Sequence, residues 1–232
     1  MDPAALASLE HTNMISAMSI FAANVDGAVV RRTDGVALMS SGLPFVLFNQ
    51  VIVEGDGATP IALAAGIGLM RERGSPFVVN LRVGADDAVA ATALELGLVR
   101  MSERSWMPGM AMHPVPIEPA RGEIAGYEIR RPIDRAGLED HIHTAAAGFD
   151  MTEELIRAVV APSLLDRDDV AIYVGYADGE PVATGLGFRT GSTIGVYNIA
   201  TVESFRGRGY GAAMTQRVVA DGVAAGCDVA IL

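Results

Sequence analysis

The feature that most restricts the fold of this chain is a glycine-rich turn at residues 206–212, with the sequence Arg-Gly-Arg-Gly-Tyr-Gly-Ala. It lies between a largely apolar run, Ile194–Val202, and a helical pattern over residues 212–225. Three glycines in five residues leave the backbone without side-chain cover, so its N–H groups can turn inward around one anion. The helix that follows adds the positive end of its dipole. The segment therefore predicts a strand–turn–helix unit that binds a diphosphate.

Length and charge limit the partners of such a site. The chain has 232 residues, of which 50% are apolar, and this is enough for one large domain or two small ones. Its formal net charge is −11, and an acidic surface repels nucleic acid and anionic membranes. We therefore expect neither as a partner. An anionic ligand needs a local basic pocket, which Arg206 and Arg208 can supply.

Cysteine usage and hydropathy indicate the compartment. The single cysteine, Cys227, allows no disulfide framework and no multi-cysteine zinc cluster, so we expect a buried apolar residue and no metal site. The longest apolar run, Ile61–Met70, is too short to cross a membrane. The N-terminus lacks the basic region of a signal peptide. These features predict a cytoplasmic protein.

The first half of the chain alternates strand and helix patterns, which predicts an α/β domain over residues 1–113. We expect a helix over residues 3–23, strands at 28–32, 36–40 and 45–53, a helix over 61–73, a strand at 77–83, a helix over 86–96, and further strand at 98–105 and 110–113. Residues 114–124 contain three prolines and a glycine, which resist regular structure, so we expect a linker there.

The second half predicts another unit over residues 125–232. We expect a strand at residues 127–132, a helix over 134–147, a second helix capped by Asp150 or Thr152, a meander of strands at 169–177, 181–188 and 192–202, and then the glycine turn, its helix and a strand at 228–232. Strand–helix–strand units occur in both halves, which is consistent with a weak internal duplication or with chance. The predicted fold class is α/β (α+β), with a mixed central sheet flanked by helices.

Two other phosphate-binding motifs fit the turn less well. A Walker loop needs Gly-Lys-Ser/Thr, and the turn has no lysine. A dinucleotide fingerprint, G-x-G-x-x-G/A, is matched by Gly207, Gly209 and Ala212. That fingerprint directly follows its strand and opens its fold, whereas here residues 201–206 intervene and an antiparallel meander comes first. A dinucleotide-dependent oxidoreductase is therefore an alternative rather than the main hypothesis.

In this order of elements, Arg206-x-x-Gly209-x-Gly211 resembles the acyl-CoA signature of the GNAT-type N-acetyltransferases, Gln/Arg-x-x-Gly-x-Gly/Ala. The segment Ile199–Val202 is similar to the fourth strand of that family and Gly226–Leu232 to its fifth, and the resemblance covers roughly residues 125–232. It implies the acyl-CoA N-acyltransferase fold. The first unit resembles, more faintly, a degenerate copy in which Glu54 and Asp56 stand where arginines would be, so it should not bind coenzyme A.

The resemblance implies an enzyme that moves the acetyl group of acetyl-CoA to a primary amine of a small molecule or peptide by direct attack. A backbone N–H of the fourth strand would stabilise the oxyanion. The cofactor-binding residues that it implies are Ala200, Thr201 and Val202, which would bind the pantetheine arm, and Arg206, Gly207, Arg208, Gly209, Tyr210, Gly211 and Ala212, which would hold the pyrophosphate.

The resemblance leaves the proton transfers open. Asn198 and Glu203 are the polar catalytic candidates around the end of the fourth strand, although Glu203 is also consistent with a solvated loop carboxylate. His141 and His143 on the first helix of the second unit are further candidates, or incidental helical histidines.

The chain shown ends with the fifth strand of the family's fold, so we expect the sixth and seventh strands and a downstream tyrosine acid to lie beyond Leu232 or to be absent. A non-catalytic acyl-CoA sensor is the corresponding alternative. The uncovered terminal strand would attract either the missing tail or a partner, as in a homodimer.

Overall fold

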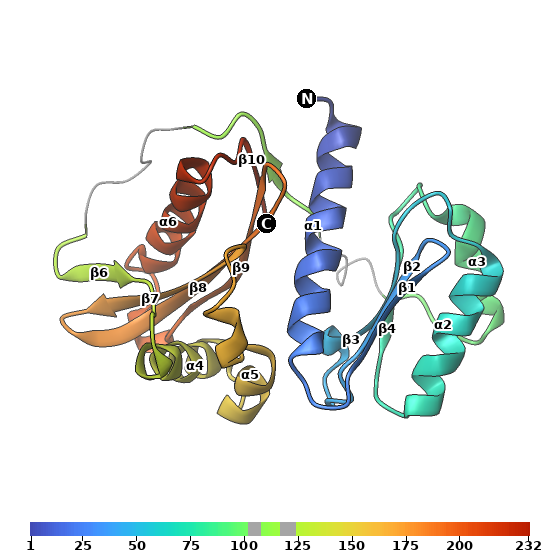
Figure 1. Cartoon of the computed structure of the whole chain (residues 1–232), viewed down its shortest axis with the longest axis horizontal. Coiled ribbons are helices and arrows are strands. Elements are labelled where there is room, and N and C mark those ends of the chain that lie inside the picture. Colours follow the sequence, from blue (N-terminus) through green and yellow to red (C-terminus); the bar gives the residue numbers. More distant parts are fainter. Residues whose placement is uncertain (102–107, 117–123) are drawn as a thin grey trace. The chain divides into compact units, whose positions relative to one another are not determined.

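The computed structural model describes residues 1–101, 108–116 and 124–232, and its contacts divide the chain into two units (Figure 1). One unit comprises residues 1–13 and 109–232, and the other comprises residues 14–108. The helices are α1 (Pro3–Ala23), α2 (Pro60–Arg73), α3 (Asp87–Glu95), α4 (Arg135–Phe149), α5 (Glu153–Val159) and α6 (Tyr210–Ala224), with short 3-10 helices η1 (Val46–Phe48), η3 (Pro162–Leu164) and η4 (Glu203–Phe205). The strands are β1 (Val29–Thr33), β2 (Val36–Ser40), β3 (Asn49–Val53), β4 (Val78–Asn80), β5 (Ala111–Met112), β6 (Tyr127–Arg130), β7 (Val170–Ala177), β8 (Glu180–Thr190), β9 (Thr193–Thr201) and β10 (Val229–Ile231).

The unit of residues 14–108 is built on the sheet β1-β2-β3-β4. Its first three strands form an antiparallel meander, and β4 pairs in parallel with β3 after the crossover helix α2. All five residues of β2 and all five of β3 are buried. One apolar cluster contains Leu63 and Ile67 of α2, and another contains Ile15 of α1. Both faces of the central strands are therefore covered.

The other unit is built on the sheet β5-β10-β9-β8-β7-β6. The strands β7, β8 and β9 form an antiparallel meander, and β10 pairs in parallel with β9 after the crossover helix α6. Figure 1 shows α6 on one face of this sheet and α4 with α5 on the other. The succession meander, helix, parallel strand is thus the same in both units.

The predicted mixed α/β class is confirmed, and most predicted elements occur within a few residues of their expected bounds. Cys227 is buried, with 4% exposure, as predicted. The helix starts follow the capping rules, because Thr59, Asp134 and Thr152 each accept a hydrogen bond from a backbone N–H three residues ahead. Asp150 is instead the left-handed residue that ends α4, so of the two predicted caps for α5 the structure selects Thr152.

Three predictions require correction. The expected strand at residues 45–53 begins only at Asn49, because the Asn49 side-chain amide donates to the carbonyls of Leu43 and Phe45 and this favours the turn η1. The segment 110–113, expected in the first unit, contributes β5, which pairs with β10 of the other sheet. The boundary of that unit therefore lies at Gly109 and not at the predicted linker. The expected strand at 98–105 is wrong over residues 98–101, which are in no strand, and it continues into residues 102–107, outside the described residues. The linker falls partly on residues 117–123, which are also outside them.

The crossover helix α6 lies close against the sheet because glycines face it. A Cβ on Gly222 of α6 would lie 2.6 Å from the Cβ of Ile194, and one on Gly185 of β8 would lie 2.6 Å from Cγ of Met214. Met214 and Val218 are fully buried in the same cluster. This packing fixes where α6 begins relative to the end of β9.

We expect Gly222→Ala to destabilise the protein by about 1–3 kcal/mol, because the added methyl group would overlap a branched side chain in a close-packed core. Gly68→Ala in α2 is the matched control, because a Cβ there meets nothing within 4 Å. The higher helix propensity of alanine should raise its free energy of unfolding by about 0.5–1 kcal/mol. Urea unfolding of both variants measures the difference. Equal shifts would contradict the packing argument.

Candidate functional site

The predicted glycine turn lies at the end of β9, where it leads through η4 into α6. Gly207 and Gly209 adopt left-handed φ angles of 78° and 91°, which only glycine adopts without strain. Gly209 is the N-cap of α6 and has no side chain to satisfy the first N–H groups of the helix. The sequence therefore forms an uncapped helix start at a strand end, as predicted.

The amides of this turn are available to a ligand. Within the part of the chain that the structure describes, none of the N–H groups from Gly207 to Ala212 donates to a backbone carbonyl, whereas that of Ala213 already bonds to Gly209. The turn itself is exposed at Arg206, Gly207 and Arg208. A row of N–H groups without a backbone acceptor at the positive end of a 15-residue helix is suited to an anion.

The two arginines of the turn are anchored by backbone carbonyls. Arg206 donates from Nε to the carbonyl of Thr201 at 3.0 Å and from Nη2 to the carbonyl of Gly148, near the end of α4, at 2.8 Å. Arg208 donates to the carbonyl of Ser204 at 3.1 Å and lies over the ring of Phe205. Both guanidinium groups thus stay beside the exposed amides with their positive charges uncompensated by a carboxylate in the described residues.

The strand β9 has a β-bulge and an open edge before it reaches the turn. Asn198 is left-handed, with a φ of 55°, and the pairing of β8 with β9 shifts register there. Along the other edge of β9, pairing with β10 stops at Gly195, which lies opposite Ile231. The backbone of β9 from Val196 to Thr201 therefore has no strand partner on that edge among the described residues.

The comparisons with known proteins agree with this geometry. Residues 129–230 match the family model described as acetyltransferase (GNAT) domain. Residues 129–230 form a GNAT acetyltransferase domain. A search of the curated proteins found no match.

Solved structures share the fold over most of the chain. A GCN5-related N-acetyltransferase from Kribbella flavida is similar with a TM-score of 0.67 and 16% identity, over 94% of this chain and 83% of that one. A GCN5-related N-acetyltransferase from Sphaerobacter thermophilus has a TM-score of 0.55 and 18% identity, over 85% and 67%. A conserved protein of unknown function from Staphylococcus epidermidis has a TM-score of 0.53 and 16% identity, over 90% and 83%. At these identities the likeness shows the fold.

The bulge of the GNAT domain is fixed by a buried histidine. His141 of α4 is fully buried; its Nδ1 lies 3.0 Å from the carbonyl of Tyr173 and its Nε2 lies 2.7 Å from Nδ2 of Asn198. A carbonyl can only accept, so Nδ1 carries the proton and Nε2 accepts from the Asn198 amide. Thr184 donates to the carbonyl of Asn198 at 2.9 Å. The side chain of Asn198 therefore holds the bulge.

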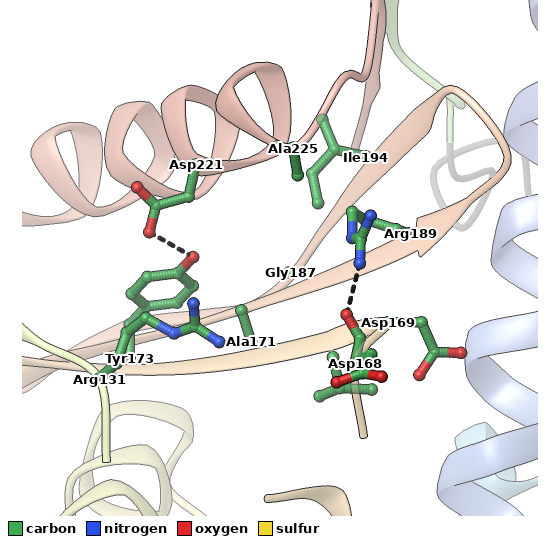
Figure 2. Close-up of a pocket in the computed structure, with 12 residues that line it drawn as sticks. Arg131, Asp168, Asp169, Ala171, Tyr173, Gly187, Arg189, Ile194, Asp221 and Ala225 are labelled. Carbon is green, nitrogen blue, oxygen red and sulfur yellow. Dashed lines mark hydrogen bonds between the residues drawn. The ribbon is translucent and has the colours of Figure 1, made fainter. Parts of the chain in front are cut away.

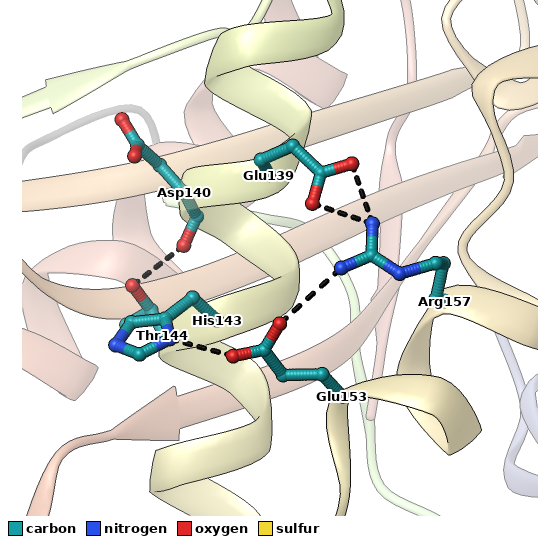
Figure 3. A network of polar contacts seen from close by, with 6 residues as sticks. All are labelled: Glu139, Asp140, His143, Thr144, Glu153 and Arg157. Carbon is teal, nitrogen blue, oxygen red and sulfur yellow. Dashed lines mark hydrogen bonds and ion pairs between the residues drawn. The ribbon is translucent and has the colours of Figure 1, made fainter.

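The other predicted catalytic residues of the GNAT domain lie apart from one another. Glu203 is exposed on η4, past the end of β9, which matches the solvated carboxylate. His143 is exposed on α4, where it pairs with Glu153 at 2.8 Å. Figure 3 shows that Glu153 also binds Arg157, which in turn binds Glu139, so this network joins α4 to α5. The partner of His143 is therefore Glu153 of this network, which lies on α5 and outside the glycine turn.

A pocket of about 100 Å³ lies at the other end of α6 (Figure 2). Tyr173 donates from its hydroxyl to Asp221 at 2.9 Å, and Arg189 donates to the carbonyl of Asp168. Burial and the bond to Asp221 raise the pKa of the Tyr173 hydroxyl. None of the predicted site residues lines this pocket.

The described residues contain no group of three or more side chains suited to hold a metal ion. No helix within the described ranges is long and apolar enough to cross a membrane.

We expect His141 to make the GNAT domain sensitive to acid. Burial lowers the pKa of His141 to about 4, whereas an unfolded histidine titrates near 6.5. The unfolded state therefore binds the proton first, and stability is lost as pH falls from about 6.5 to about 4, by about 3 kcal/mol from this group. In urea unfolding, His141→Gln should lack this part of the loss of unfolding free energy at low pH. His143→Gln, on the exposed side of the same helix, should show the loss as wild type does. Parallel pH profiles for His141→Gln and wild type would refute the assignment.

Proposed function

We propose that this chain transfers the acetyl group of acetyl-CoA to a primary amine. The observation that carries the proposal is the row of N–H groups from Gly207 to Ala212, at the start of α6 in a GNAT acetyltransferase domain, that donate to no backbone carbonyl among the described residues. A pyrophosphate needs several donors converging on two adjacent anionic groups, and helix N-termini of this kind provide them. The acidic net charge of the chain makes this basic turn the natural place for such a ligand.

The residues present fit coenzyme A. The amides of residues 207–212 would hold the pyrophosphate, with Arg206 and Arg208 adding charge. The backbone at Ala200, Thr201 and Val202, at the end of β9, would bind the pantetheine amides in the manner of an added strand. The Thr201 carbonyl already accepts from Arg206 and the Val202 amide already donates to Val182, so the remaining backbone groups would make these bonds. The last pair between β9 and β10 is Gly195 with Ile231, and we place the thioester along β9 beyond this pair.

When bound, acetyl-CoA supplies an activated acetyl group, and the chain positions an amine to attack it. The bulge at Asn198 turns the backbone of β9 out of its ladder, which frees main-chain N–H groups for the developing oxyanion. We assign Asn198 to holding this bulge, because its amide is committed to His141. Glu203, exposed on η4, remains a candidate beside the proposed cofactor loop.

We also propose that residues 14–108 form a degenerate GNAT-like copy without a cofactor site. The supporting observation is the shared succession of meander, crossover helix and parallel strand. The start of its helix α2 is satisfied internally, because Thr59 accepts from the amide of Ala62 and Pro60 has no N–H. Glu54 pairs with Arg32 and Asp56 with Arg82, so carboxylates already occupy the arginines near this loop.

Calorimetry with acetyl-CoA and with NAD tests the ligand. We expect acetyl-CoA to bind and NAD to give no heat, and preferential binding of NAD would favour an oxidoreductase. Release of free thiol from acetyl-CoA across a panel of amines tests turnover. Binding without thiol release for any amine would favour an acyl-CoA sensor.

We expect Ala212→Glu to weaken coenzyme A binding by about 100-fold, because a carboxylate in the first turn of α6 would face the pyrophosphate. Ala212 is exposed, and a glutamate there complements the helix dipole, so the fold should be retained. Ala220→Glu, exposed on the same helix two turns away, is the control. We prefer this pair to a substitution at Gly209, whose φ of 91° would strain any side chain. Undiminished binding by Ala212→Glu in calorimetry would show that the ligand lies elsewhere.

A further inference from the structure

The first turns of α1 bring a carboxylate to the GNAT sheet. Residues 1–13 belong to the same unit as the GNAT domain. Asn13 fixes this segment, because its amide nitrogen donates to the carbonyl of Phe188 at 3.1 Å and to Oγ1 of Thr190 at 2.8 Å, while its oxygen accepts from the Tyr197 hydroxyl at 2.6 Å. Glu10 lies one helical turn before Asn13 and therefore faces the same sheet.

Glu10 lies between β5 and the part of β9 that follows its last pair with β10. On one side its carboxylate packs against Gly109, where a Cβ would lie 2.8 Å from the Glu10 Cδ. Gly109 leads into β5, which pairs with β10, and the neighbouring Met110 exchanges two backbone hydrogen bonds with Leu232. On the other side the charge of Glu10 acts on Tyr197 of β9, two residues past the last pair between β9 and β10.

The carboxylate is on the face of the sheet opposite α6. Ile194 and Val196 of β9 pack in the apolar cluster with Met214 of α6. Side chains alternate along a strand, so Tyr197 points to the other face, where it meets Asn13. A thioester held along β9 from the α6 side would thus meet an acceptor arriving past Glu10.

A hollow of about 330 Å³ opens there, lined by Pro3, Leu6, Ala7, Glu10, Gly109 and Ala111. Its walls are aliphatic and Glu10 is its one charged lining residue. Within residues 1–101, 108–116 and 124–232, no hydrogen bond or ion pair engages the carboxylate of Glu10. An aliphatic hollow with a single unpaired carboxylate suits an amine carried on an apolar arm.

We propose that Glu10 is the general base of the reaction and that the hollow binds the acceptor as an ammonium ion. This inference rests on the proposed acetyl transfer and adds to it the base and the entrance for the amine. The ammonium gives one proton to the Glu10 carboxylate and becomes a neutral amine. The nitrogen lone pair forms the C–N bond to the acetyl carbon while the C–S bond breaks, and the second proton lost by the nitrogen goes to the sulfur. Glu10 returns its proton to solvent.

The environment of Glu10 suits this role. Partial burial raises the pKa of the Glu10 carboxyl above its ordinary value near 4.5, and the neighbouring His11 opposes the rise. The other titratable group that faces it is Tyr197, whose hydroxyl pKa is raised by burial and by the charge of Glu10. A base with a raised pKa takes a proton from an ammonium more readily than an ordinary carboxylate does. Asn198 and His141 are bonded to each other, so we assign the role of base to Glu10 and to neither of them.

Glu10→Gln tests the proposal, with the exposed Glu180→Gln at the start of β8 as the control. We expect Glu10→Gln to bind acetyl-CoA in calorimetry as the wild type does, and to lose about 100-fold in kcat/KM for thiol release at pH 7. The kcat/KM of Glu10→Gln should rise with pH, because a larger share of the amine is then neutral without a base on the protein. Glu180→Gln should behave as wild type. Wild-type kcat/KM and pH profile in Glu10→Gln would overturn the role of Glu10 and leave the acetyl transfer standing.

A second measurement is independent of turnover. Because the folded state raises the pKa of Glu10, the charged carboxylate destabilises the protein as pH rises above about 4.5. We expect Glu10→Gln to unfold at higher temperature than wild type at pH 8 and at the same temperature at pH 4. Equal melting temperatures at pH 8 would show that the carboxylate is not desolvated and would overturn the proposal. If the wild type neither binds acetyl-CoA nor releases thiol, the proposed function fails, and this inference fails with it.

Discussion

The close packing of α6 on the strands β8 and β9 is the constraint on which the candidate site depends. Glycines at positions 185, 187 and 222 remove the side chains that would separate the helix from the sheet. The first turn of α6 is thereby held at the end of β9, and this packing restricts the positions of its amides. A phosphate-binding turn needs that rigidity, because donors that must first be ordered lose part of their binding free energy.

A second constraint acts on the opposite face. The contacts of Asn198 with His141 and Thr184 keep a left-handed residue in the middle of a long strand, where the backbone conformation is unfavourable for most side chains. Asparagine tolerates this conformation better than other residues, and the bond to a neutral, buried histidine makes the choice specific. The bulge and the glycine turn are therefore held from two sides of one strand, by α4 and by α6.

The sequence predicted the parts of this site that depend on local backbone chemistry. The glycines and arginines of residues 206–212 indicated the turn, and the order of strands and helices around them indicated the fold. The role of His141 could not be predicted, because its partner Asn198 lies 57 positions away and only the packing of α4 on β9 brings them together. Glu10 had no sequence signal, since an isolated carboxylate in an N-terminal helix is ordinary until its neighbours are known. The strand at residues 45–53 was overestimated because hydrophobic composition does not report the side-chain hydrogen bonds of Asn49.

The pairing of β5 with β10 has a practical consequence for anyone who divides this protein. The family model matches residues 129–230, whereas the structural unit comprises residues 1–13 and 109–232. Asn13 bonds to the sheet of this unit, and residues 111–112 form its outer strand β5. A fragment begun at residue 125 would expose the outer edge of β10 and lose the helix that braces Tyr197. Bare strand edges recruit other chains, so such a fragment would tend to aggregate even though every residue of its recognisable domain was present.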